Sequence, residues 1–215
     1  METVSDALKR GANIIYGRGR LVSLNDYKWT ILDYSDSIDK VACIPGETIG
    51  GGYNDADISF VLLMRDFADG SFSFHRISAR LKEFLLSSSS VTLSPENVHI
   101  VEPIFVSISV TVWAEVQNMD DSFEVQNLIK ETLTNYFNPV RNENDNGWEI
   151  GIVPKKTQIM MKLGTLKSHA LIYRTTMIAS YVDGTGAHET DIADLKITPF
   201  MVVKSGEHKV IISYK

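Results

Sequence analysis

The sequence is poor in cysteine and in long apolar runs, and both absences narrow what the chain can be. Cys43 is the only cysteine, so no intramolecular disulfide forms and a small disulfide-stapled secreted scaffold is excluded. No apolar run reaches the roughly 20 residues that span a bilayer, and residues 1–6 lack the pattern of a signal peptide. We expect a chain that is synthesised in the cytoplasm and is not inserted into a membrane.

An excess of basic charge is also missing. The chain has 21 Lys and Arg against 27 Asp and Glu, and its formal net charge is −6. Nucleic-acid binding requires a basic face, so we expect no nucleic-acid partner. The hydrophobic content of 44% and the charged content of 22% are typical of an ordinary globular protein. At 215 residues, the chain can bury a core as one domain or as two small ones.

Complete phosphate-binding motifs are absent. Residues 17–20 supply only Gly-x-Gly, without the third glycine of a dinucleotide fingerprint. Residues 50–52 are three glycines without the Lys-Ser/Thr pair that completes a phosphate loop. Both segments are typical of turns, and we expect no bound cofactor.

One stretch imitates the start of a calcium loop. Asn142, Asn144 and Asn146 precede Gly147 at the spacing of an EF-hand, but the twelfth position is Val153 instead of glutamate. Three neutral amides without the closing carboxylate do not make a calcium cage. The segment therefore indicates a solvated turn, and we expect no metal site.

Residues that can perform catalysis are dispersed. The five histidines have no other His or Cys within four residues, and no Gly-x-Ser-x-Gly elbow is present. Cys43 lies within a strand pattern, which favours a buried thiol over a nucleophile. An enzyme would need a site assembled from distant residues such as His75, His99 and Asp120. We therefore expect that the chain is not an enzyme.

The sharpest positive signal is the alternation of residues 104–116. Apolar side chains occupy the even-numbered positions, whereas Ser, Thr, Trp and Glu recur at the odd ones. This period of two predicts a strand with its even-numbered face buried. Trp113 lies on the opposite face, where a core role and an interface role are both open.

The remaining elements follow in two similar series. In the first half we predict a helix capped by Asn25 or Asp26, and a strand that stops at Pro45. In the second half we predict that the last two strands turn at Ser205 and Gly206. The predicted strands are 38–44, 58–64, 98–101, 104–116, 171–181, 194–199, 200–204 and 209–214, and the predicted helices are 26–34, 71–86, 123–138 and 157–166.

This order predicts an α+β fold made of two small sheet-plus-helix units in tandem, of a ferredoxin-like kind. Pro103 is the natural boundary. We expect an N-terminal unit at residues 1–102 and a C-terminal unit at residues 103–215.

Five short segments carry a family resemblance. Residues 16–27 fit the pattern GR-x-V-(T/S)-x-x-D-(F/Y), and residues 38–43 fit I-x-x-V-x-C. Residues 98–108 resemble a strand of the form (V/I)-x-x-P-x-(Y/F)-V-x-(V/I). Residues 133–139 resemble L-x-x-(Y/F)-(L/F)-x-P, and residues 147–151 resemble GW-x-(F/I)-G. In this order, the segments resemble the baseplate J-like proteins of contractile tails.

That resemblance implies a structural role. Such a protein is a wedge component of the baseplate of a contractile phage tail or of a phage-derived injection system. It is assembled into the particle after synthesis, and its partners are other wedge subunits and itself. Members are usually longer at the N-terminus, so the chain resembles the C-terminal portion of that architecture, and its last fifty residues match less well. The alternative is an α+β module that binds a peptide or small ligand without catalysis.

Two of the family-like segments supply candidate interface residues, because Arg and aromatic side chains most often anchor protein interfaces. An alternative for Trp148 is that it fills the core, and an alternative for Arg20 is that it pairs with Asp26. The candidates are Arg18, Arg20, Tyr27, Trp29 and Trp148.

Overall fold

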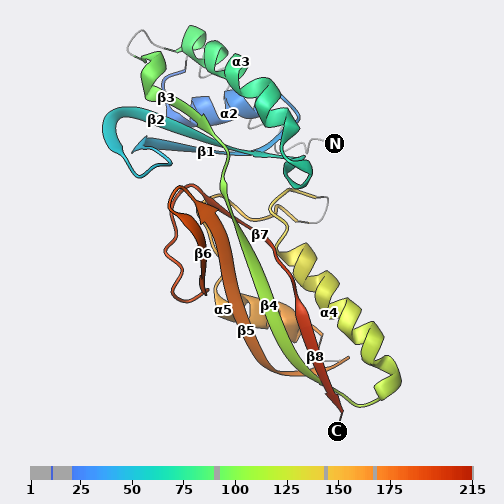
Figure 1. The fold of residues 1–215 in the computed structure, drawn as a ribbon. Coiled ribbons are helices and arrows are strands. Elements are labelled where there is room, and N and C mark those ends of the chain that lie inside the picture. Colours follow the sequence, from blue (N-terminus) through green and yellow to red (C-terminus); the bar gives the residue numbers. More distant parts are fainter. Residues whose placement is uncertain (1–10, 12–20, 90–92, 143–144, 167–168, 215) are drawn as a thin grey trace. The chain divides into compact units, whose positions relative to one another are not determined.

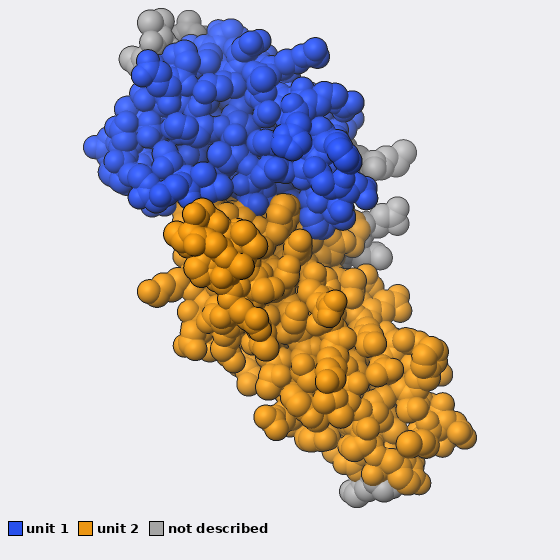
Figure 2. All heavy atoms as spheres, in the orientation of Figure 1, with its two compact units in different colours: residues 1–103 blue, residues 104–215 orange. Residues whose placement is uncertain are grey.

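The computed structural model describes residue 11 and residues 21–89, 93–142, 145–166 and 169–214 (Figure 1). The chain divides into two compact units, residues 1–103 and residues 104–215, here called unit 1 and unit 2 (Figure 2). Each unit has its own sheet and its own hydrophobic core. The α+β class predicted from the sequence is confirmed.

The sheet of unit 1 has the order β1-β2-β3. Strands β1 (Ile38–Glu47) and β2 (Tyr53–Met64) form an antiparallel hairpin, and β2 pairs in parallel with β3 (Val98–Val101). Helix α3 (Phe72–Ser88) connects the two parallel strands. Because β2 and β3 are direct neighbours, this connectivity differs from the split βαβ of a ferredoxin-like unit.

Strand β1 continues beyond the point where the sequence predicted a turn. Pro45 pairs with Ile58 within the hairpin, and the register shifts between Pro45 and Glu47. Proline is tolerated here because β1 lies at the edge of the sheet, where a missing N–H leaves no ladder partner unsatisfied.

Helices α2 (Leu24–Tyr34) and α3 pack on the same side of this sheet (Figure 1). A capping box starts α2: Asp26 N donates to Ser23 Oγ at 3.2 Å, and Ser23 N donates to Asp26 Oδ2 at 2.8 Å. The predicted cap at Asn25 or Asp26 is therefore wrong, because Ser23 is the N-cap. The core of the unit is formed by Tyr27, Ile31, Phe60, Leu62, Met64, Leu81 and Leu85, among others.

Strand β4 (Ile104–Val116) is the centre of the sheet of unit 2. On one side it pairs antiparallel with β5 (Leu171–Asp183), which in turn pairs with the edge strand β6 (Gly186–Asp191). On the other side β4 pairs in parallel with β7 (Met201–Ser205) and then with β8 (Lys209–Tyr214). These five strands form the order β6-β5-β4-β7, with β8 also on β4.

The last two strands do not pair with each other. Strand β7 runs beside Ile104–Ile108 and β8 runs beside Thr111–Val116, so they form one interrupted edge. The predicted turn at Ser205 and Gly206 is therefore a break in the line of the edge rather than a hairpin. At this break, Gly206 N donates to Ile108 O at 3.0 Å.

The predicted burial of the even-numbered face of β4 is confirmed. Helices α4 (Ser122–Tyr136) and α5 (Lys156–Gly164) pack against this face. The buried residues of β4 are Val106, Ile108, Val110, Val112, Ala114 and Val116. Short 3₁₀ turns occur at Phe67–Asp69, Pro95–Asn97 and Met119–Asp121.

One predicted strand is wrong and one observed strand was not predicted. Residues 194–199 contain apolar Leu195 and Ile197 at alternate positions, but no strand pairs with them and Ile197 is exposed. Strand β6 is polar, and its hydrogen bonds to β5 hold it in place. A polar edge strand carries no hydrophobic period, so sequence patterning does not detect it.

Candidate interaction surfaces

Trp148 is anchored within unit 2. Its indole Nε1 donates to Tyr136 O at 2.6 Å, and its ring meets the Tyr136 ring edge-on at 5.4 Å between centroids. The side chain packs against the core next to α4. These contacts favour the alternative in which Trp148 fills the core, since the side chain is partly buried against it.

Gly147 explains why this loop can close. Its φ is +64°, and a Cβ built there would lie 2.4 Å from Pro139 O, so only glycine fits. Within the former calcium candidate, Asn142 N donates to Asp145 O at 2.9 Å and Gly147 N donates to Asp145 Oδ1 at 3.1 Å. Asn144 lies outside the described residues. Across the described chain, no group of three His, Cys, Asp or Glu is placed to hold a metal ion.

Tyr27 is a core residue of unit 1. It is 7% exposed, its ring lies 5.3 Å from that of Phe60, and its hydroxyl donates to Ser89 Oγ at 2.9 Å. Burial leaves Tyr27 little surface for a partner, which corrects its place among the interface candidates.

Trp29 follows on α2 and is partly exposed. Arg18 and Arg20 lie outside the described residues. Asp26, the alternative partner of Arg20, accepts hydrogen bonds from Val22 N and Ser23 N through its carboxylate.

The odd-numbered face of β4 carries cation–π contacts. The guanidinium of Arg174 lies 4.7 Å from the ring of Trp113, and Lys204 Nζ lies 5.4 Å from the ring of Phe105. Both aromatic rings are partly exposed. Trp113 therefore lies on a partly exposed face of the sheet, with Arg174 stacked on it.

The residues considered for catalysis have local roles or are separated. His75 is on α3, His99 is on β3 with Nε2 3.7 Å from Asp57 Oδ2, and Asp120 lies in the turn before α4 in unit 2. Cys43 is half-buried on β1, and burial raises the pKa of its thiol to about 12. A thiol with that pKa stays protonated near neutral pH and is a poor nucleophile.

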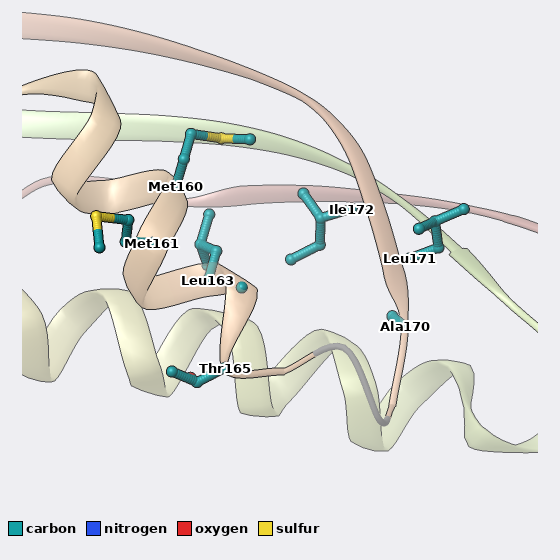
Figure 3. A pocket seen from close by; sticks show the side chains of 8 residues that line it. Met160, Met161, Leu163, Thr165, Ala170, Leu171 and Ile172 are labelled. Atoms are coloured by element: carbon teal, nitrogen blue, oxygen red, sulfur yellow. The ribbon is translucent and has the colours of Figure 1, made fainter.

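An apolar groove lies between α5 and the start of β5 in unit 2 (Figure 3). Its volume is about 570 Å³. Two of its side chains are largely exposed, Met161 at 76% and Leu171 at 60%. Met160 is held in place because Thr175 Oγ1 donates to its Sδ at 3.0 Å. The groove is lined by Met160, Met161, Leu163, Gly164, Thr165, Ala170, Leu171 and Ile172.

This groove is not among the sites predicted from the sequence. One signal was present in the chain: residues 150–182 contain five Lys and Arg but no Asp or Glu, although the whole chain is acidic. An exposed apolar groove in a basic stretch marks a surface suited to a partner.

Among the residues that the structure describes, no helix is both long and apolar enough to cross a bilayer.

Comparison with known proteins finds neither a matching family model nor a matching curated protein. A solved structure does match, a chain of the cryo-EM structure of the anti-feeding prophage (AFP) baseplate, symmetrised sixfold. The TM-score is 0.58 at 17% identity, and the alignment covers 97% of this chain. The two chains share a fold. Our chain spans 42% of the length of that baseplate chain.

Proposed function

We propose that this chain is a structural component of the baseplate of a contractile phage tail or a phage-derived injection system. Within that assembly it acts as a wedge subunit of the baseplate J-like kind. Its function is to bind other wedge subunits and itself through protein surfaces, without catalysis and without a cofactor. Its site of action is the assembled particle.

The observation that carries this proposal is the fold likeness to a chain of the AFP baseplate. The likeness extends over 97% of the chain, so it involves both units and not one common sheet motif. The ordered motifs between residues 16 and 151 support a baseplate role independently, because they depend on residue identities and spacing alone. A fold by itself does not fix a function, so the test must address assembly directly.

The surface chemistry supports assembly over catalysis. The half-buried thiol of Cys43 has its pKa raised to about 12, and the apolar groove of unit 2 is lined mainly by Met, Leu, Ile and Ala side chains. Flexible methionines at an exposed apolar surface are typical of protein-binding sites. The groove also favours the alternative of a peptide-binding module, which the same experiment distinguishes.

The test is co-expression with the proteins encoded next to this one, followed by affinity purification and electron microscopy. We expect neighbouring baseplate subunits to co-purify in a fixed ratio. Trp29→Ala and Arg20→Ala should each reduce the amount of co-purified partner while leaving the far-UV circular dichroism of the isolated chain unchanged. Trp148→Ala serves as a contrast, because we expect it to lower the thermal midpoint of the isolated chain. The proposal fails if the chain co-purifies with no neighbour under conditions in which the neighbours assemble with each other.

A further inference from the structure

The tip of the β1–β2 hairpin presents an exposed aromatic side chain among acidic ones. We call residues 47–57 the acidic hairpin. Tyr53 is 73% exposed, and Ile49 on the same tip is also exposed. Residues 41–64 contain Glu47, Asp55 and Asp57 and no Lys or Arg. This end of unit 1 is therefore apolar and negatively charged.

Tyr53 is held in one position although it is exposed. Its ring lies over Gly46, where φ is +79° and a Cβ would approach Tyr53 Cε2 to 2.8 Å. A hydrogen bond with Asp55 is the main cause that raises the pKa of Tyr53, so the phenol keeps its proton. Two bonds close the turn: Thr48 N donates to Gly52 O at 3.0 Å and Gly51 N donates to Thr48 O at 2.9 Å. A fixed, exposed tyrosine loses little entropy on binding, which suits an interface anchor.

The apolar groove of unit 2 has the complementary properties. Its exposed side chains include Met161 and Leu171. Lys156 and Lys162 are exposed on α5 and supply positive charge beside the groove. The groove volume of about 570 Å³ lies within the roughly 300–1,000 Å³ of pockets that enclose sizeable ligands. It therefore has room for large apolar side chains with acidic neighbours.

We infer that the groove of one molecule receives the acidic hairpin of a second copy of this chain. Tyr53 and Ile49 fill the groove, while Glu47 and Asp55 lie against Lys156 and Lys162 of α5. The contact joins unlike surfaces, so it is head-to-tail and leaves one hairpin and one groove free in each dimer. Repetition of such a contact produces a ring or an open polymer. This inference rests on the proposed assembly role and names the partner and the surfaces.

Charge reversal on each side, followed by their combination, tests the inference by sedimentation velocity across a concentration series. The hairpin variant is Glu47→Lys/Asp55→Lys, and the groove variant is Lys156→Glu/Lys162→Glu. Each alone opposes like charges and should weaken self-association by at least about tenfold. The chain carrying all four substitutions restores opposite charges and should regain self-association to within a few-fold of wild type.

A matched control separates the contact from a general effect of charge. Arg76→Glu/Arg80→Glu on the exposed side of α3 changes the net charge by the same amount as the groove variant and should leave self-association unchanged. The contribution of the Tyr53 aromatic side chain is tested separately. Tyr53→Ala should weaken self-association, whereas Tyr53→Phe should retain most of it. Circular dichroism of every variant confirms that the fold is intact.

The inference is overturned if the wild-type chain stays monomeric at all concentrations. It is also overturned if the control weakens association as much as the groove variant, or if the fourfold variant does not recover. Co-purification of the wild-type chain with neighbouring baseplate subunits is scored independently. If the chain is monomeric but still co-purifies with them, this inference fails and the proposed function stands. If the chain self-associates but co-purifies with no neighbour, the proposed function fails and this inference stands.

Discussion

At the scale of single residues, His208 fills the break between β7 and β8. Val110 N on β4 donates to His208 Nδ1 at 3.3 Å, so this nitrogen must be unprotonated. The other nitrogen, Nε2, then carries the proton and donates to Ser205 Oγ at 3.0 Å. The ring stacks on Phe137 at 5.7 Å between centroids. A neutral imidazole thus completes the hydrogen bonding of β4 where backbone pairing stops.

We expect His208 to make the stability of unit 2 depend on pH. Burial lowers its pKa to about 4, whereas the unfolded chain has an ordinary value of about 6.5. As pH falls below about 6.5, the unfolded state binds a proton that the folded state resists, so stability falls until about pH 4. Because the ring remains partly accessible to water, we expect a loss of about 1–2 kcal/mol.

Urea unfolding at pH 7.5 and pH 5 measures this loss. His208→Gln removes the titrating group and should flatten the difference between the two pH values. His169→Gln is the control, because His169 is exposed and should leave the difference unchanged. An equal pH dependence in wild type and His208→Gln would show that other groups cause it.

Gly147 permits a second test at the same scale. Gly147→Ala must place a side chain at φ +64° and within 2.4 Å of Pro139 O, so the loop has to move. We expect a loss of at least about 2 kcal/mol in the free energy of unfolding, from left-handed strain plus the clash. The control is Gly50→Ala, where no atom lies within 4 Å and no positive φ is imposed. Equal stability of the two variants would contradict this account of the loop.

At the scale of elements, β4 organises unit 2 because it pairs on both edges and buries one face. The face is set by the period of two, since a shift by one residue exposes every apolar side chain. The helices were predictable for the corresponding reason: α3 and α4 repeat apolar residues at helical spacing, and Leu81, Leu85, Ile129 and Leu133 are all buried. Elements with one apolar face were thus found from the sequence.

The two faces of β4 should respond differently to truncation. Ile108→Ala removes a fully buried side chain from the core and should lower the free energy of unfolding by about 2–5 kcal/mol. Thr111→Ala on the opposite, partly exposed face should change it by about 0.5 kcal/mol or less. Chemical denaturation followed by circular dichroism compares them. Similar losses for both variants would mean that the odd-numbered face is also packed as core.

At the scale of the whole molecule, the described residues form two separate hydrophobic cores. The core of unit 1 contains Phe60, Leu81 and Leu85, and the core of unit 2 contains Ile108 and Ile129, with no residue shared between them. Trp29 lies in unit 1, whereas Trp113 and Trp148 lie in unit 2. Tryptophan fluorescence therefore reports on each unit through different residues.

We expect a core substitution to act mainly on the unit that contains it. Leu81→Ala should lower the midpoint of the transition reported by Trp29 by an amount equivalent to about 2–5 kcal/mol, and should shift the transition of unit 2 much less. Urea unfolding of Trp29→Phe, which reports on unit 2 alone, assigns the two signals. Coincident shifts of both transitions would indicate that the two units unfold as one cooperative structure.

The sequence by itself determined the α+β class, the long strand at 104–116 and most of the helices, because each depends on a local hydrophobic period. It also determined the motifs that suggest a baseplate protein, since these are residue identities at fixed spacing. Only the tertiary structure decided the place of β6, whose hydrogen bonds come from β5, and the alignment of β7 and β8 along one edge. It also decided that Tyr27 is core, and it placed Met161 and Leu171 in one groove. These features depend on pairing and packing between segments that are distant in the sequence, so no local pattern of residues predicts them.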